Sequence, residues 1–176
     1  MSNIKQMIRI SLFAAMISIS VYLFPPFIVP YANITFTLQT LLIVLIGFLL
    51  KPSEAFLSSF IYLLLGAIGL PVFSSARGGI QMIVGPTGGF LILFPFLSLS
   101  ISLLKSKTKH TFYDLTISFI LAIPVLYLLA NLWLSYSLSL NYWKALLSLI
   151  PFVPFDIMKL VFAYFIYQKI PKELFD

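Results

Sequence analysis

An aspartate and a lysine stand three residues apart in the otherwise apolar stretch PFVPFDIMKLVFAYFI, residues 151–166. Side chains at positions i and i+3 of a helix share one face, so Asp156 and Lys159 can form an ion pair and also contact a third polar group. Charges inside an apolar helix are costly and usually face a ligand or ion path. The pair is therefore a candidate binding site. The alternative is an ion pair that only holds helices together.

A second polar group lies in ITFTLQT, residues 34–40. Thr37 and Gln39 can exchange hydrogen bonds with a ligand, or they can cap the helix that follows. Asn33 to Thr35 also matches a glycosylation sequon, which matters only in a eukaryotic secretory pathway. Both the binding and the capping role stay open for Thr37 and Gln39.

The elements that carry these residues have the composition of a membrane protein. Of the 176 residues, 61% are hydrophobic and only 9% are charged. A water-soluble domain needs more charge to cover its surface, and the apolar runs are near the ~20 residues with which a helix crosses a bilayer. We predict an all-α, polytopic membrane protein, a bundle of six transmembrane helices forming a single domain, residues 1–176. The expected spans are residues 8–29, 38–50, 54–70, 82–104, 113–134 and 145–168.

The basic residues set the expected orientation. The net charge of +6 would suggest nucleic acid only if the cations formed one patch, but they fall between the apolar runs. Eight of the eleven lie on the side of the two termini, two lie on the other side, and Lys159 lies within the last span. The positive-inside rule therefore places both termini in the cytoplasm. The inner cations are Lys5, Arg9, Lys51, Lys105, Lys107, Lys109, Lys169 and Lys172, and the outer ones are Arg77 and Lys144.

Two shorter signals concern the first three spans. The N-terminal run begins like a signal peptide but is long and lacks a small-residue cleavage site, so we expect it to be retained as the first span. In KPSE, residues 51–54, Pro52 can start a helix and Ser53 or Glu54 can serve its first turn. We expect the second and third spans to form a tight hairpin.

The segment GAIGLPVFSSARGGIQMIVGPTGGF, residues 66–90, holds seven of the eight glycines. Glycine permits turns and close backbone approach, and proline limits helix continuation. Non-helical backbone is tolerated at membrane depth only where protein or a watery cavity covers it. Because Val72 and Phe73 are too apolar for a loop in water, we expect the segment to fold inward over a site on the outer side. A flexible exposed loop is the alternative.

Small residues four apart recur in the first span, where Ser11 precedes Ala15 and Ala14 precedes Ser18. This spacing lets another helix approach closely, either within the chain or from a partner. The polar loop KSKTKH, residues 105–110, sets topology or, alternatively, binds a partner.

The chain offers little for catalysis. It has no cysteine and a single histidine, His110, and neither a nucleophile with its base nor a metal-ligand set is assembled in the sequence. We expect a protein that is not an enzyme and that needs no cofactor.

Four motifs, in order along the chain, resemble the BioY family of biotin-binding membrane subunits, the substrate-capture (S) components of energy-coupling factor (ECF) transporters. They are ITFTLQTLLIVLIGFLL (34–50), YLLLGAIGLPVF (62–73), GPTGGF (85–90) and PFDIMK (154–159). The resemblance implies a six-helix bundle in the cytoplasmic membrane that binds biotin on the outer side. It also implies a transmembrane T component, contacted by small first-span residues, and a pair of ATPase subunits. Ser11, Ala14, Ala15 and Ser18 match that contact loosely.

The resemblance gives the candidate site residues roles toward biotin. Asp156 would accept from a ureido N–H and Lys159 would donate to the ureido carbonyl. Phe73 would pack on the bicyclic ring, Gln39 or Thr37 would add hydrogen bonds, and Arg77 would hold the carboxylate.

Two rival functions stay open. In a stand-alone secondary transporter of a small vitamin or carboxylate, Asp156 would carry a proton, and uptake would collapse with the proton gradient and need no ATPase. An intramembrane lipid enzyme is the second rival, disfavoured by the shortage of acids and histidines.

Overall fold

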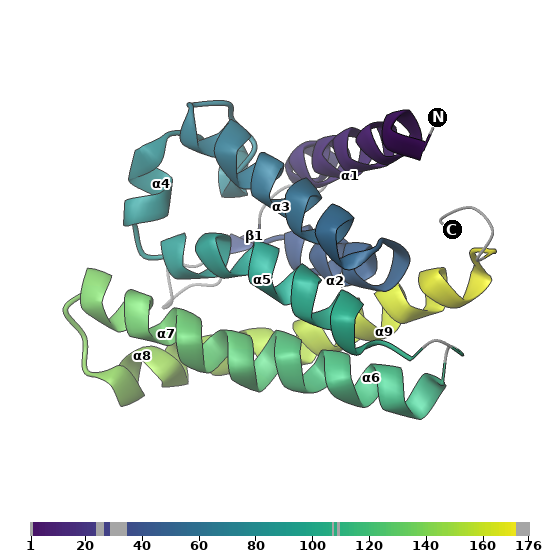
Figure 1. The fold of residues 1–176 in the computed structure, drawn as a ribbon. Helices are drawn as coiled ribbons and strands as arrows, with labels where there is room; N and C mark the ends of the chain where they lie inside the picture. Colours follow the sequence, from purple (N-terminus) through teal and green to yellow (C-terminus); the bar gives the residue numbers. More distant parts are fainter. Residues whose placement is uncertain (1, 24–26, 29–34, 107, 109, 172–176) are drawn as a thin grey trace.

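The computed structural model describes residues 2–23, 27–28, 35–106, 108 and 110–171. Lys107, Lys109 and Lys172 of the expected inner cations, and Asn33 of the sequon, lie outside these ranges. The described chain is helical apart from its connections and a ribbon of two short antiparallel strands, β1 (Phe27–Ile28) and β2 (Thr35–Phe36) (Figure 1). The helices are α1 (Ser2–Leu23), α2 (Gln39–Leu49), α3 (Pro52–Ala67), α4 (Ile80–Val84), α5 (Gly88–Leu104), α6 (Thr111–Ile120), α7 (Leu126–Ser137), α8 (Tyr142–Leu149) and α9 (Val153–Lys169).

Three shorter turns connect some of these helices. The π turn η2 (Leu121–Val125) contains Pro124, which has no N–H to donate, and the wider turn lets α6 continue into α7 across it. The 3-10 turn η3 (Ile150–Phe152) joins α8 to α9 at two prolines, and a further 3-10 turn, η1 (Ser74–Ala76), lies in the glycine-rich segment.

Six apolar helical stretches fall where the six spans were expected. Three of them are long and apolar enough to cross a membrane, namely Asn3–Leu23, Thr111–Ser137 and Tyr142–Lys169. The others, α2, α3 and α5, are shorter, and α2 has only 11 residues, or about 16 Å against a hydrocarbon core of about 30 Å. Because protein buries α2 along almost its whole length, few of its side chains need to meet lipid. The number of membrane crossings stays a prediction.

Two expected spans have wrong ends. The first was expected to continue to residue 29, but α1 ends at Leu23, and Phe27 and Ile28 pair with β2 instead. The fourth was expected to be continuous from residue 82, but it breaks at Gly85, whose backbone is extended. A residue before proline is biased away from the helical region, so Pro86 explains this break.

The second and third spans are joined as tightly as expected, since only Leu50 and Lys51 separate α2 from α3. Pro52 is the first residue of α3, and Glu54 lies in its first turn, where a carboxylate is favoured. The two helices nevertheless pack mainly on α5 rather than on each other.

The helix α2 forms the centre of the bundle, packed on α1, α5 and α9, while α1 also lies against α3 and α5 against α7 (Figure 1). The Phe48 ring stacks on Tyr167, with 5.0 Å between ring centroids, and meets Tyr164 edge to face at 5.5 Å. These contacts fix α9, which carries Asp156 and Lys159, against the centre.

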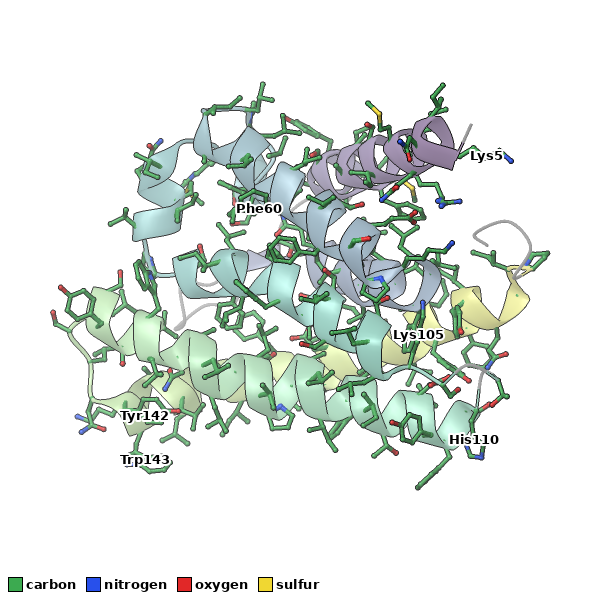
Figure 2. All side chains as sticks on the ribbon, in the orientation of Figure 1. Lys5, Phe60, Lys105, His110, Tyr142 and Trp143 are labelled. Carbon is green, nitrogen blue, oxygen red and sulfur yellow. The ribbon has the colours of Figure 1, made fainter. Side chains whose placement is uncertain are left out.

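The two ends of the bundle differ in charge. The start of α1 and the end of α9 lie at one end, together with Lys5, Lys105 and His110, whereas Tyr142 and Trp143 lie at the opposite end (Figures 1 and 2). Of the expected inner cations, Lys5 and Lys105 therefore lie at the same end of the bundle. Which end faces the cytoplasm stays a prediction.

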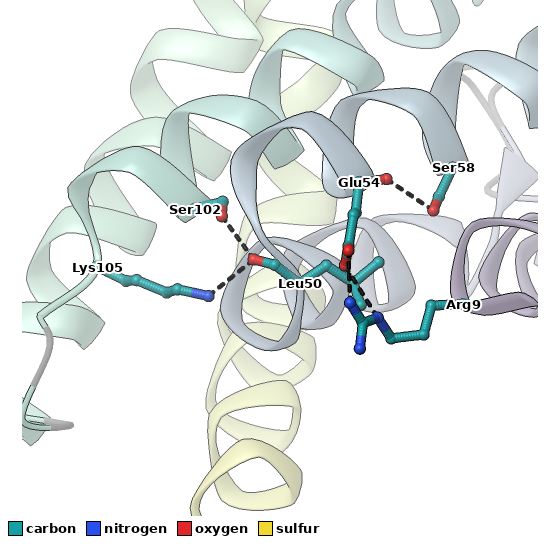
Figure 3. A network of polar contacts seen from close by, with 6 residues as sticks. All are labelled: Arg9, Leu50, Glu54, Ser58, Ser102 and Lys105. Atoms are coloured by element: carbon teal, nitrogen blue, oxygen red, sulfur yellow. Dashed lines mark hydrogen bonds and ion pairs between the residues drawn. The ribbon is translucent and has the colours of Figure 1, made fainter. Parts of the chain in front are cut away.

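Polar contacts join α1 to α3 and α2 to α5 at the end of the bundle where Lys105 lies (Figures 2 and 3). The Arg9 guanidinium forms a bidentate ion pair with Glu54, with Nη2 2.6 Å from Oε1 and Nε 3.1 Å from Oε2. Lys105 Nζ donates to the carbonyls of Phe48 and Leu50 at 2.6 and 2.9 Å, and Ser102 Oγ donates to Leu50 at 2.7 Å. Arg9 and Lys105, predicted only as topology signals, thus also hold α1 to α3 and cap the end of α2.

Candidate binding pocket

A pocket lies between the first turns of α2, α5, α7 and α9, at the end of the bundle away from Lys105 (Figure 2). About 580 Å³ of space free of protein atoms lies in and over it, and this volume includes space open to the outside. Its lining combines apolar rings with a few polar groups. The lining residues are Thr37, Gln39, Thr40, Ser74, Thr87, Phe90, Leu91, Phe94, Tyr127, Leu149, Phe152, Asp156 and Lys159.

Asp156 and Lys159 form the predicted ion pair at the floor of this pocket. Lys159 Nζ lies 2.7 Å from Asp156 Oδ1, and the two side chains are only 8% and 10% exposed. The first turn of α9 carries Asp156, and the positive end of the helix dipole favours a carboxylate there. The pair therefore faces a pocket rather than only another helix.

The third polar group at the pair is Tyr127 of α7, whose hydroxyl donates to Asp156 Oδ2. Its ring meets Phe90 of α5 edge to face, with centroids 5.9 Å apart. The i, i+3 spacing predicted that some third group could join the pair, but it did not identify Tyr127. A tyrosine in the middle of an apolar run is the signal that was missed, because a buried hydroxyl needs a partner.

Thr37 and Gln39 both line the pocket, as expected for binding residues, and Gln39 is nearly fully buried. Leu38 is the residue at the N-cap of α2, and no side chain caps this helix end. The capping alternative for Thr37 and Gln39 is therefore wrong. Thr37 Oγ1 instead donates to Gln39 Oε1 at 3.2 Å.

Phe73 and Arg77 lie outside the pocket lining. The Phe73 ring is fully buried and meets Tyr62 edge to face at 5.6 Å. Arg77 is exposed and lines an adjacent polar pocket that shares Ser74 and Thr87 with the first one. Arg77 thus lies beside the site, in the adjacent polar pocket, whereas the Phe73 side chain packs in the core.

The glycine-rich segment folds inward in part, as predicted, but part of its first half is exposed, with Ile68 77% and Leu70 44% exposed. Val72 and Phe73 are buried, although Ile80 of α4 is 61% exposed. Near the end of the segment, a Cβ on Gly89 would lie 2.7 Å from Trp133 Cβ, so glycine here lets α5 approach α7 closely.

The small residues of α1 divide between two faces. Ala14 and Ser18 are buried, whereas Ser11 and Ala15 are exposed beside apolar side chains such as Leu12 and Ile19. Packing on the neighbouring helices explains the first two, and an external contact stays open for the second two. The described residues include no cluster of three or more histidine, cysteine, aspartate or glutamate side chains that could hold a metal ion.

A model of the BioY family matches residues 1–176. The chain belongs to the BioY family. It is 33% identical over 167 residues to the probable biotin transporter BioY of Pyrococcus horikoshii, covering 94% of this chain and 96% of that one. It is 34% identical over 169 residues to the biotin transporter BioY of Thermotoga maritima, covering 96% of each chain.

The fold of this BioY-family chain is also that of a solved structure, the S-component for biotin from an ECF-type ABC transporter. The TM-score is 0.88 at 24% sequence identity, with 99% of this chain and 96% of the other covered. The resemblance carried by the four motifs is thus confirmed as membership of the BioY family, and the helical fold is confirmed with it.

Proposed function

We propose that this protein captures biotin with high affinity and serves its uptake as the substrate-specific S component of an ECF-type ABC transporter. The observation that carries the proposal is family membership over residues 1–176, combined with a pocket that presents a buried ion pair. Relatives that cover almost the whole chain are named biotin transporters.

In the proposed topology the chain is one unit that crosses the cytoplasmic membrane six times, with both termini in the cytoplasm. The positions of Lys5 and Lys105 at one end of the bundle (Figure 2) support this orientation. The pocket then opens on the outer side, where the ligand is met first, and membrane lipid surrounds the apolar helix faces.

Biotin enters this pocket with its ureido ring first. Asp156 accepts from a ureido N–H, since a carboxylate has about four acceptor positions and Tyr127 and Lys159 each use one. Lys159 donates to the ureido carbonyl, so each ion keeps its countercharge. Rings that line the pocket, Phe90 and Phe152, take the packing role that was expected of Phe73.

The carboxylate of biotin points outward to Arg77. The Asp156–Lys159 pair brings roughly no net charge, and a second carboxylate beside it would be repelled by Asp156. Arg77 lies in the polar pocket that adjoins the ureido site and carries a planar fork suited to a carboxylate.

Coupling to transport belongs to partner subunits, a transmembrane T component and a pair of ATPases that hydrolyse ATP. The exposed small residues Ser11 and Ala15 offer a flat place on α1 where a helix of the T component can approach.

Calorimetry of the purified protein with biotin tests the central claim. Saturable binding with one biotin per chain is expected, and no binding at concentrations that saturate vitamin scavengers would refute it. Uptake into vesicles then separates the two transport mechanisms. An S component needs ATP and its partners, whereas uptake by this chain alone that collapses with the proton gradient would establish the secondary transporter.

A further inference from the structure

Gln39 lines the pocket, yet its amide group is bound by protein. Nε2 lies 2.7 Å from the Tyr62 hydroxyl oxygen and 3.2 Å from the Val72 carbonyl oxygen. A carbonyl can only accept, so the Val72 contact requires the NH₂ group on that side and fixes the orientation of the amide. Both N–H bonds of Gln39 are therefore directed at Tyr62 and Val72 rather than into the pocket.

Gln39 and its partner Tyr62 contact two neighbouring residues of the glycine-rich segment, Val72 and Phe73. Tyr62 is fully buried and does not line the pocket, and its ring meets that of Phe73 edge to face at 5.6 Å. The Phe73 ring lies directly over Gly66, where a Cβ would come within 2.0 Å of Phe73 Cζ. The hydrogen bond from Gln39 to Val72 and the ring contact of Tyr62 with Phe73 thus keep these two residues packed in the core.

The residue after Phe73, Ser74, belongs to the pocket lining. The Phe73 N–H donates to the Arg77 carbonyl at 2.9 Å and closes a tight loop. Within this loop Ser74 lines the pocket, and Ser75 and Ala76 have φ values of 61° and 52°. Such left-handed backbone is strained in residues other than glycine and persists only where the surroundings hold it. The positions of Ser74 and Arg77 therefore depend on the packing of Val72 and Phe73 in the core.

We propose that Gln39 is a positioning residue, a latch that keeps the Val72–Arg77 segment closed over the pocket without holding the ligand itself. Loss of the latch leaves the Asp156–Lys159 pair intact but lets the segment open more often, so that a bound ligand dissociates faster. The effect on ligand retention rests on the proposed function, whereas the latch is a property of the chain without ligand.

Thiol labelling tests the latch directly. The chain has no cysteine, so the labelling rate of one introduced thiol measures the solvent access of that position alone. Val72→Cys puts a buried thiol in the segment and leaves the Val72 carbonyl in place. Adding Gln39→Met should raise its labelling rate about tenfold in the absence of biotin, as expected when a buried hydrogen-bonded group is lost. Tyr62→Phe should raise the rate less, and it should add nothing in the Gln39→Met background, because it acts through Gln39.

Ser118→Cys is the matched control, a fully buried position on α6 away from the segment. Its labelling rate should not change with Gln39→Met, and an equal rise at both thiols would overturn the proposal in favour of general unfolding. Biotin release should accelerate in Gln39→Met with association nearly unchanged. Weaker biotin binding with unchanged Val72→Cys labelling would make Gln39 a direct ligand contact and would also overturn the latch. If the parent protein binds no biotin, the proposed function fails while the labelling result still decides the latch.

Discussion

Removing either charge of the Asp156–Lys159 pair should cost more biotin affinity than removing any exposed charge. The side chains are 10% and 8% exposed and their charged atoms lie 2.7 Å apart, so Asp156→Asn or Lys159→Met leaves the other ion buried without its countercharge. Truncating a buried, hydrogen-bonded charge pair at a binding site costs about 2 to 5 kcal/mol. That range corresponds to an affinity loss of about 30-fold at its lower end and above 1,000-fold at its upper end.

Calorimetry on the two single variants is the assay, with Lys144→Met as the control because Lys144 is exposed on α8. Since breaking a buried pair also destabilises the fold, thermal unfolding of each variant is measured in parallel. The double variant Asp156→Asn, Lys159→Met removes both charges and should regain stability without regaining affinity. Wild-type affinity in the single variants, or affinity restored in the double variant, would show that the pair is merely structural.

Three further predictions concern single side chains. Tyr127→Phe removes the hydrogen bond to Asp156 and should weaken biotin binding about tenfold in titrations, since hydrogen bonds to charged groups contribute about 1.5 to 3 kcal/mol; unchanged affinity would contradict the role given to Tyr127. Ala15→Leu should leave biotin binding intact and prevent co-purification with a T component, whereas Ala14→Leu should lower the melting temperature because Ala14 is buried; an undisturbed complex with Ala15→Leu would remove the proposed contact. Biotin amide should bind the wild type severalfold more weakly than biotin does, but it should bind Arg77→Ala as well as biotin does; if the two ligands become equal only in Lys159→Met, the proposed ligand orientation is reversed.

The helices could be predicted because their signals are local. Apolar runs, prolines and the KPSE junction place α2 and α3 to within a few residues. The end of α1 could not be read in this way, because the pairing of Phe27 with Phe36 joins residues on both sides of a connection. The break before α5 had a local signal, Pro86 after Gly85. The prediction nevertheless joined the two helices into one span, because the residues on both sides of the break are apolar.

In the site, too, contacts between residues close in sequence could be predicted, and contacts between distant residues could not. The Asp156–Lys159 pair was predictable because one helix turn separates the two residues. Tyr127 lies 29 residues before Asp156, and only the packing of η2 on α9 and of α7 on α5 and α8 brings the two together. The direction of the Phe73 side chain depends on the turn that Arg77 closes and on Gly66 beneath the ring, neither of which a residue pattern reports.

The polar contacts at the end opposite the pocket favour a capture subunit over a stand-alone carrier. A carrier that alternates its access must open toward the cytoplasm in every cycle without help from a partner. Opening between α1 and α3 would break the bidentate Arg9–Glu54 pair, in which Glu54 is only 2% exposed. Opening between α2 and α5 would remove the caps that Lys105 and Ser102 place on the last carbonyls of α2. Opening would let water hydrate both ions and offset part of this loss, so the cost lies mainly in the hydrogen bonds and helix packing that are lost, and the proposed partner subunits would supply that free energy.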